Sequence, residues 1–275
     1  MRDNFSNFHP LVSLIYFFVV MAFCMVFMHP ISLTISLVCA IFYCFTSVQG
    51  KKTWRTILYI IPMIIIMALL NPLLNHRGVT TLIILPWGNP LTLESTLFGV
   101  ATAFMIVAIF FWFICFNYVM SSDKIIFIFG KLSPTLGLII SMSLQLIPRF
   151  KERLNQISNA RNALGLPNSY FKSLSILVTW ALENSIETAA SMKSRGYGLG
   201  NRTFFSIYTF KAKDSYLLIF ICICVVAILF GLYNNVFAFN YFPYIRYYTP
   251  NLFGAIIFFI YLLLHLIPIM VSRIT

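Results

Sequence analysis

The sequence is poor in charge, and most of all in negative charge. Of its 275 residues only 9% are charged, with seven Asp and Glu against 19 Lys and Arg. A soluble globular protein carries about 25% charged residues. Hydrophobic residues make up 60% of the chain, in uncharged blocks long enough for a helix to cross a bilayer, which takes roughly 20 residues. The composition excludes an ordinary soluble protein and predicts an all-α, polytopic membrane protein.

The sequence also lacks the motifs that would give it a chemistry of its own. It has no Walker A sequence, no Asp-rich diphosphate motif and no G-x-S-x-G. The four His show no metal-ligand spacing, and the six Cys lie inside apolar blocks without a C-x-x-C pair. No charged residue falls in the middle of an apolar block, where secondary transporters keep their ion-coupling groups. We therefore expect neither an enzyme nor a metal or other cofactor.

Six apolar segments are predicted to span the membrane. They are residues 11–28, 31–48, 56–74, 95–119, 215–233 and 251–271. The first runs into His29-Pro30 and a second apolar block without a cleavage site, so we interpret it as a retained span and not as a signal peptide.

Basic residues orient these spans. Lys51, Lys52 and Arg55 follow the second segment, which places that loop in the cytoplasm by the positive-inside rule. Both termini are then cytoplasmic, and loops 75–94 and 234–250 face outside. The rule also accounts for most of the net charge of +12 without nucleic acid as a partner. The pattern is typical of a multi-pass protein of a bacterial inner (cell) membrane.

A seventh uncharged block, residues 132–148, does not fit a span. If it crossed the membrane, the basic segment after it would lie outside, against the same rule. Prolines, glycine and polar residues also interrupt it, among them Pro134, Gly137 and Pro148. We expect a helix that packs against protein at the cytoplasmic surface.

The segment from Arg149 to Lys213 holds ten Lys and Arg and three Glu, half of the charged residues of the chain. Two helices are predicted in it from apolar residues at three- and four-residue steps. The first shows Ile147, Phe150, Leu154, Ile157, Arg161 and Leu164 on one face, and the second shows Phe171, Leu174, Val178, Ala181, Leu182, Ile186 and Ala189. Gly165 and Gly196 can each end a helix in the left-handed conformation, which predicts a helical hairpin. The chain would thus comprise membrane helices in 1–120, a cytoplasmic helical domain in 121–213 and further membrane helices in 214–275.

Two arginines in this hairpin are candidates for binding a partner. Arg161 lies on the apolar stripe of its helix, where an Arg is either paired, or snorkels to a membrane surface, or meets another protein. Arg195 lies in the last turn of its helix, where a cation also suits the helix dipole. Either guanidinium could donate two hydrogen bonds to a carboxylate of a partner.

Glu183 and Glu187 lie four residues apart on one helix. No nucleophile accompanies them, so a catalytic pair is not favoured. We expect salt bridges to Arg149, Lys151 or Arg153 of the neighbouring helix instead.

The sequence around Arg195 resembles a family signature. Residues 191–198, Ser-Met-Lys-Ser-Arg-Gly-Tyr-Gly, with Asn201-Arg202-Thr203 after them, are similar to the second Ala-Arg-Gly-type motif of one family. It is the transmembrane T component of energy-coupling factor (ECF) transporters, which includes the cobalt-transport Q proteins. The segments His9-Pro10, His29-Pro30, 90–94, 132–134 and 141–148 also resemble that family. The resemblance covers most of the chain and is most specific around residues 134–203.

The resemblance implies a scaffold without catalytic activity. In that family the T component joins two ABC-type ATPases to a small substrate-binding S component in the membrane, for vitamin or transition-metal uptake. Two coupling helices, each ending near an Arg-Gly signature, dock on the ATPases and transmit their closure. Carried over to this chain, the ATPase-coupling residues are Arg161, Gly165, Ser194, Arg195 and Gly196.

The first signature departs from the family pattern. Either Ala160-Arg161-Asn162 is the motif, with Asn in place of Gly, or Ala163-Leu164-Gly165 is, with Leu in place of Arg. Gln145 also stands where many members have Arg. The alternative functions are a secondary transporter or solute-binding membrane subunit, which needs a polar site in mid-membrane, and an intramembrane enzyme, which needs a catalytic constellation.

Overall fold

The computed structural model describes residues 4–47, 50–75, 78–84, 90–166, 169–200, 208–247 and 251–274. Its α-helices are α1 (Pro10–Val26), α2 (Pro30–Ser47), α3 (Gly50–Leu74), α4 (Leu93–Val119), α5 (Ser122–Leu132), α6 (Pro134–Ala163), α7 (Tyr170–Ser194), α8 (Ala212–Tyr233) and α9 (Leu252–Ile274). A 3-10 turn, η1 (Asn4–Asn7), precedes them. The short strands are β1 (Thr81–Ile84), β2 (Pro90–Thr92), β3 (Phe239–Asn240) and β4 (Arg246–Tyr247).

Five helices are long and apolar enough to cross a membrane. They are α2, residues Thr56–Leu74 of α3, α4, α8, and residues Leu252–Ser272 of α9. The remaining predicted span is also an apolar helix, α1, but has 17 residues. The protein is thus largely helical, with the long apolar helices expected of a polytopic membrane protein. The basic residues after the second segment lie in the first turns of α3 and not in a loop.

The chain forms two compact units. Met1–Ser121 and Tyr208–Thr275 make up the membrane unit, and Ser122–Ile207 make up the hairpin unit. The two regions predicted to hold membrane helices, 1–120 and 214–275, thus belong to one body.

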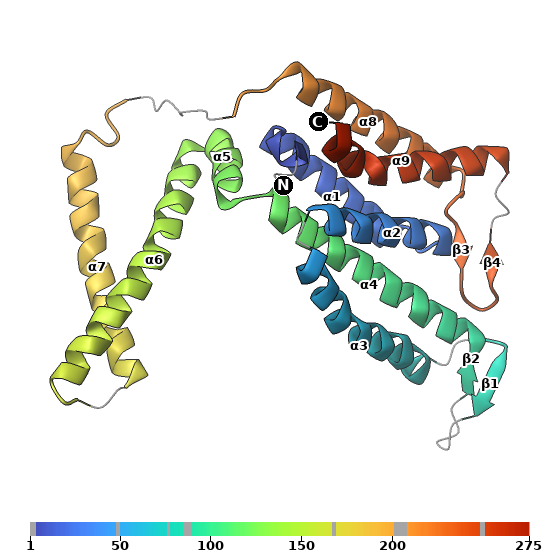
Figure 1. Ribbon diagram of the computed structural model, residues 1–275, viewed down its shortest axis with the longest axis horizontal. Coiled ribbons are helices and arrows are strands. Elements are labelled where there is room, and N and C mark those ends of the chain that lie inside the picture. Colours follow the sequence, from blue (N-terminus) through green and yellow to red (C-terminus); the bar gives the residue numbers. More distant parts are fainter. Residues whose placement is uncertain are drawn as a thin grey trace. The chain divides into compact units, whose positions relative to one another are not determined.

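In the membrane unit α4 packs against α1, α2 and α3, while α9 packs against α2 and α8. Figure 1 shows both β hairpins at one end of these helices and the two marked chain ends at the other. The six long helices of this unit therefore alternate in direction along the chain. This is the alternation that the predicted topology requires, although the side of the membrane on which each end lies stays a prediction.

Large aromatic residues fill the centre of the membrane unit, and two of them form hydrogen bonds to another helix. The indole Nε1 of Trp112 donates to the Ser36 hydroxyl at 3.0 Å, which ties α4 to α2. The Tyr16 hydroxyl donates to the carbonyl of Leu264 at 3.2 Å, which ties α1 to α9. Such bonds stabilise helix pairs where no water competes for the polar groups.

Both His-Pro pairs begin a helix in the same way. The ring Nδ1 of His9 accepts the backbone N–H of Leu11 at 3.3 Å, and Nδ1 of His29 accepts that of Ile31 at 3.2 Å. Proline follows as the first helical residue, where its missing N–H costs nothing. Burial lowers the pKa of His29, which favours the neutral ring that can accept this bond.

The two β hairpins were not predicted from the sequence. Each pairs only a few residues, β1 with β2 and β3 with β4, both antiparallel. A contact with the connection between α1 and α2 helps to hold the second hairpin, because the Tyr241 hydroxyl donates to the Met28 carbonyl at 2.8 Å. Burial raises the pKa of Tyr241 to about 12. Alternation over two to four residues is too short to predict a strand.

A buried carboxylate joins the start of α8 to the start of α1. Asp214 accepts the backbone N–H of His9 at 3.0 Å through Oδ1 and that of Lys211 at 2.8 Å through Oδ2. Its side chain is almost entirely enclosed. The carboxylate therefore connects two segments that are about 200 residues apart in sequence.

We expect Asp214→Asn to lower the thermal unfolding midpoint of the purified protein. An amide has one acceptor oxygen, so one backbone N–H would face an NH₂ group instead of an oxygen. Loss of a hydrogen bond to a buried charged group costs about 1.5–3 kcal/mol. Asp123→Asn, at an exposed carboxylate in the first turn of α5, is the control and should change little. Equal midpoints for both variants would contradict the role of Asp214.

In the hairpin unit α5 packs closely on the start of α6. A Cβ built on Gly137 would lie 2.5 Å from the Cα of Gly130, so the two backbones touch directly. The predicted block 132–148 does pack against protein here, but as part of a longer helix. The block is continuous with the first helix predicted for the hairpin, because α6 runs through Pro148 to Ala163. The missing proline N–H removes one bond of the helix without ending it.

Gly137→Ala should separate α5 from α6 and lower the unfolding midpoint. The added methyl group meets backbone, which cannot move aside as a side chain can, and such overpacking typically costs about 1–3 kcal/mol. Gly200→Ala is the matched control, since a Cβ there has nothing within 4 Å. If thermal unfolding of Gly137→Ala matches that of Gly200→Ala, the close contact is not formed.

Candidate functional site

Helix α6 ends in a Schellman motif, as Gly165 predicted. Gly165 has a φ of +68°, which favours glycine. Its N–H donates to the carbonyl of Asn162 at 3.0 Å, and the N–H of Leu166 donates to that of Arg161 at 3.1 Å. These are the two hydrogen bonds that define the motif.

Helix α7 ends in the same motif. Gly196 has a φ of +83°. Its N–H donates to the Lys193 carbonyl at 3.0 Å, and the N–H of Tyr197 donates to the Met192 carbonyl at 3.0 Å. The Ser194 hydroxyl, one residue before the cap, donates to the Ser191 carbonyl at 2.9 Å. Both helices of the hairpin therefore end with equivalent backbone geometry.

This equivalence distinguishes the two registers of the first signature. The C-cap residues are Leu164 in α6 and Arg195 in α7. By position in the cap, Ala163-Leu164-Gly165 corresponds to Ser194-Arg195-Gly196. Arg161 lies three residues before the cap. The residue equivalent to Arg195 is thus Leu164, whose side chain is 75% exposed.

The two arginines predicted as site residues differ in solvent exposure. The Arg161 side chain is only 9% exposed. The buried residues in the last turns of α6 are Ile157 and Arg161, and those of α7, in its first half, are Ser173 and Leu177. The hairpin is therefore packed at its loop end. Arg195 lies at the opposite end of α7, and its side chain is exposed.

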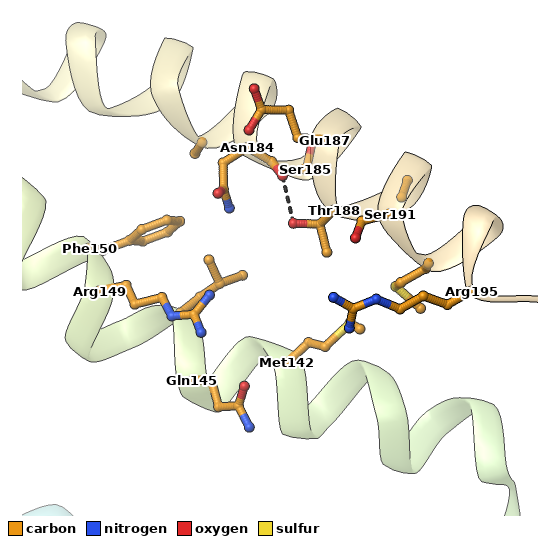
Figure 2. Close-up of a pocket in the computed structure, with 14 residues that line it drawn as sticks. Met142, Gln145, Arg149, Phe150, Asn184, Ser185, Glu187, Thr188, Ser191 and Arg195 are labelled. Atoms are coloured by element: carbon orange, nitrogen blue, oxygen red, sulfur yellow. Dashed lines mark hydrogen bonds between the residues drawn. The ribbon is translucent and has the colours of Figure 1, made fainter. Parts of the chain in front are cut away.

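At that opposite end the two helices leave a groove of about 710 Å³. Figure 2 shows Arg149 of α6 and Arg195 of α7 directed into this space from opposite walls. Gln145, which replaces the Arg expected by resemblance, also lines it. The structure thus brings Arg195 near Arg149 and Gln145, while Arg161 and Gly165 lie at the other end of the hairpin.

The predicted salt bridges are not formed. Within the part of the chain that the structure describes, neither Glu183 nor Glu187 makes an ion pair with a basic residue of α6. The guanidinium of Arg153 instead lies 5.3 Å from the centre of the Trp180 ring. Its Nη1 donates to Oε1 of Gln156 at 3.0 Å. The prediction was wrong, and at Arg153 an aromatic ring and an amide take the position expected for the carboxylates.

The apolar face predicted for α7 is not its packed face. Five of its residues are exposed: Phe171, Leu174, Val178, Leu182 and Ile186. We call these five residues the α7 stripe. The face that packs toward α6 instead carries Ser173 and Leu177. In α6 the predicted face is correct for Phe150, Leu154, Ile157 and Arg161, whereas Ile147 and Leu164 are exposed.

The membrane unit contains buried polar groups that the sequence analysis missed. His265 is fully enclosed, and its Nδ1 lies 2.9 Å from the Tyr261 carbonyl. Its Nε2, the Tyr261 hydroxyl and the Ser13 hydroxyl have no hydrogen-bond partner among the described residues. The sequence signal was a single His in the last apolar block. Nowhere in the described ranges do three His, Cys, Asp or Glu gather where a metal ion could be held.

Comparison with known proteins finds no matching family model and no matching curated protein.

Proposed function

We propose that this chain is the transmembrane coupling subunit of an ECF-type ABC importer. It would join two ABC-type ATPases to a membrane subunit that binds a vitamin or a transition metal. The hairpin unit would carry the contacts with the ATPases, and the chain itself would not catalyse a reaction. The resemblance at residues 191–198 supports this assignment.

The observation that carries the proposal is the exposed Arg195 at the capped end of α7. The Schellman motif fixes the backbone around Arg195, so its guanidinium projects from a rigid support. A planar guanidinium matches a carboxylate with two parallel hydrogen bonds, which a flexible Lys does not reproduce. This geometry suits docking on an acidic groove of an ATPase.

The two ATPase contacts would differ in chemistry. Leu164 occupies the cap position of α6 and offers an apolar side chain where α7 offers a guanidinium. The contact at α6 would then depend on apolar packing, and the contact at α7 on charge-assisted hydrogen bonds. Because Arg161 is largely buried, its role would be to hold the hairpin together and not to touch an ATPase.

The α7 stripe is a candidate contact surface for the second partner, the substrate-binding membrane subunit. Five large apolar side chains in line along one helix form an exposed surface of the kind that marks a protein or membrane contact. Helices of a membrane subunit could pack against it. We propose that the stripe receives the substrate-binding subunit.

Co-purification tests the proposal. The chain should purify from its native membrane with two ABC ATPase subunits, and the isolated chain should not hydrolyse nucleotide. Nucleotide turnover by the isolated chain, or a functional complex without an ATPase, would refute the proposal.

Cysteine labelling tests the orientation of the chain. In a background without the native cysteines, Thr179→Cys should react with a membrane-impermeant maleimide only after the cells are opened, because α7 would be cytoplasmic. Tyr244→Cys, between β3 and β4, should react in intact cells. Both positions are exposed, so access of the reagent does not limit either reaction. The reverse pattern would place the hairpin outside and remove the ATPase role.

The buried polar groups of the membrane unit keep a secondary transporter as the alternative. His265, Tyr261 and Ser13 supply polar atoms inside the helix bundle that no described side chain bonds. Polar groups inside a membrane bundle often line a substrate or ion path. Substrate uptake by vesicles that contain this chain without any ATPase would favour the alternative.

A further inference from the structure

The groove between α6 and α7, at the end of the hairpin opposite the loop, brings two positive charges together. Arg149 and Arg195 enter it from opposite walls, and among the described residues neither guanidinium forms a hydrogen bond or ion pair. One acidic residue, Glu187, is among the lining residues, but Figure 2 shows its carboxylate directed away from α6. Two guanidinium groups that face one shared space repel each other unless an anion lies between them. The groove therefore suits an anionic group.

The rest of the groove is largely apolar. Met142, Leu146 and Phe150 of α6 face Ala189 and Met192 of α7 across it. A free phosphate would use only the two guanidinium groups and would leave this lining exposed to water. An amphiphile with an anionic head and a hydrocarbon chain would cover both parts. The volume of about 710 Å³ lies in the range typical of ligand sites.

A peptide helix fits the groove less well. A helix with its side chains is about 10–12 Å wide, so the groove would hold fewer than two of its turns. A lipid chain is narrower and can follow the apolar lining. Volume and lining thus favour a lipid over an acidic helix.

Of the two helices that form the groove, α6 begins close in sequence to a membrane span. α5 starts at Ser122, only three residues after α4 ends at Val119, and a single residue separates α5 from α6. The first half of α6 carries no charge before Arg149, and its Leu136 and Ile139 are exposed. Apolar residues followed by arginines are typical of helices that lie at the headgroup level of a bilayer.

We propose that the groove binds one anionic phospholipid, with its phosphate between Arg149 and Arg195 and an acyl chain along Met142 and Leu146. A phosphate has enough oxygens to accept hydrogen bonds from both guanidinium groups at once. The bound lipid neutralises the repulsion between the two arginines. It thereby connects α6 and α7 at the open end of the hairpin, opposite the loop end where the two helices pack. The site forms in the chain without an ATPase partner, and docking of Arg195 on ATPase carboxylates, as proposed above, would replace its contact with the phosphate.

The test is native mass spectrometry of the full chain in detergent, with phosphatidylglycerol or phosphatidylcholine added at equal ratios. The first phosphatidylglycerol should be retained at least five times more than phosphatidylcholine. The double variant R149Q/R195Q should lose this preference. K151Q and K172Q, which remove exposed cations of α6 and α7 outside the groove, should keep it. Equal unfolding midpoints would show that the variants are folded.

Four outcomes would overturn the proposal. One is wild-type protein that retains both lipids equally, which needs no variant to be decisive. Another is an equal loss in K151Q and R149Q/R195Q, which would indicate general attraction to basic surface. The third is displacement of the lipid by millimolar glycerol phosphate, since the ligand would then be a free phosphate. The fourth is arginine-dependent binding of a poly-glutamate peptide without phosphatidylglycerol binding, since the ligand would then be an acidic peptide. Retention of lipid by the wild type despite glycerol phosphate would support the acyl-chain contact.

Discussion

Arg195→Glu should abolish both the recovery of ATPase subunits with this chain and substrate uptake. If the guanidinium docks between carboxylates of an ATPase, the substitution removes charge-assisted hydrogen bonds and places like charges together. Truncating one partner of such a buried pair costs about 2–5 kcal/mol, and repulsion adds to that. Arg195→Lys keeps the charge without the planar fork, so we expect a partial loss. Uptake and ATPase pull-down are measured at matched membrane expression.

Two further variants separate docking from folding. Lys172→Glu changes an exposed charge on the same helix and should be nearly silent, since exposed pairs contribute about 0–1 kcal/mol. Arg161→Glu should lower the unfolding midpoint, because Arg161 is buried in the hairpin, whereas Arg195→Glu should leave it unchanged. Normal transport by Arg195→Glu together with failure of Lys172→Glu would show that the family motif does not apply at this end of α7.

The helix ends were predictable because they depend on local chemistry. Only residues near Gly165 and Gly196 decide where α6 and α7 stop, and glycine can adopt the positive φ that the Schellman motif needs. The apolar blocks were equally informative, since the bilayer requires long uncharged helices. The continuity of the block 132–148 with the first helix of the hairpin was not predicted; proline disturbs one turn of a helix without always ending it.

The packed face of α7 could not be predicted from its own sequence. Apolar periodicity identified the α7 stripe, and in a self-contained soluble hairpin that face would be buried. Here Ser173 and Leu177 pack toward α6, and the larger side chains stay outside. The sequence of one helix does not say which neighbour it packs against. The register of the first signature could not be predicted for the same reason. Arg161 and Leu164 differ in burial only after α6 and α7 have packed together.

Leu182→Glu should lower substrate uptake at least tenfold while ATPase subunits still co-purify. Leu182 lies in the middle of the α7 stripe and is 63% exposed. If an apolar membrane subunit packs there, the substitution buries an unpaired carboxylate in the interface, which costs several kcal/mol. Each 1.4 kcal/mol is a tenfold change in an equilibrium constant. The measurement is uptake together with the amount of substrate-binding subunit that purifies with the chain.

Ile176→Glu is the matched control for this prediction. Ile176 is an exposed apolar residue of the same helix, 45% accessible, and six residues at 3.6 per turn place it about 120° around α7 from Leu182. A partner on the stripe would be disturbed by a charge at Leu182 and not at Ile176, whereas a general effect of added charge on α7 would appear in both variants. Normal uptake by Leu182→Glu would mean that the stripe faces no partner during transport. Loss of ATPase co-purification in Leu182→Glu, with Arg195 intact, would instead indicate that the ATPases themselves cover the stripe, because the two partners would then share one face of α7.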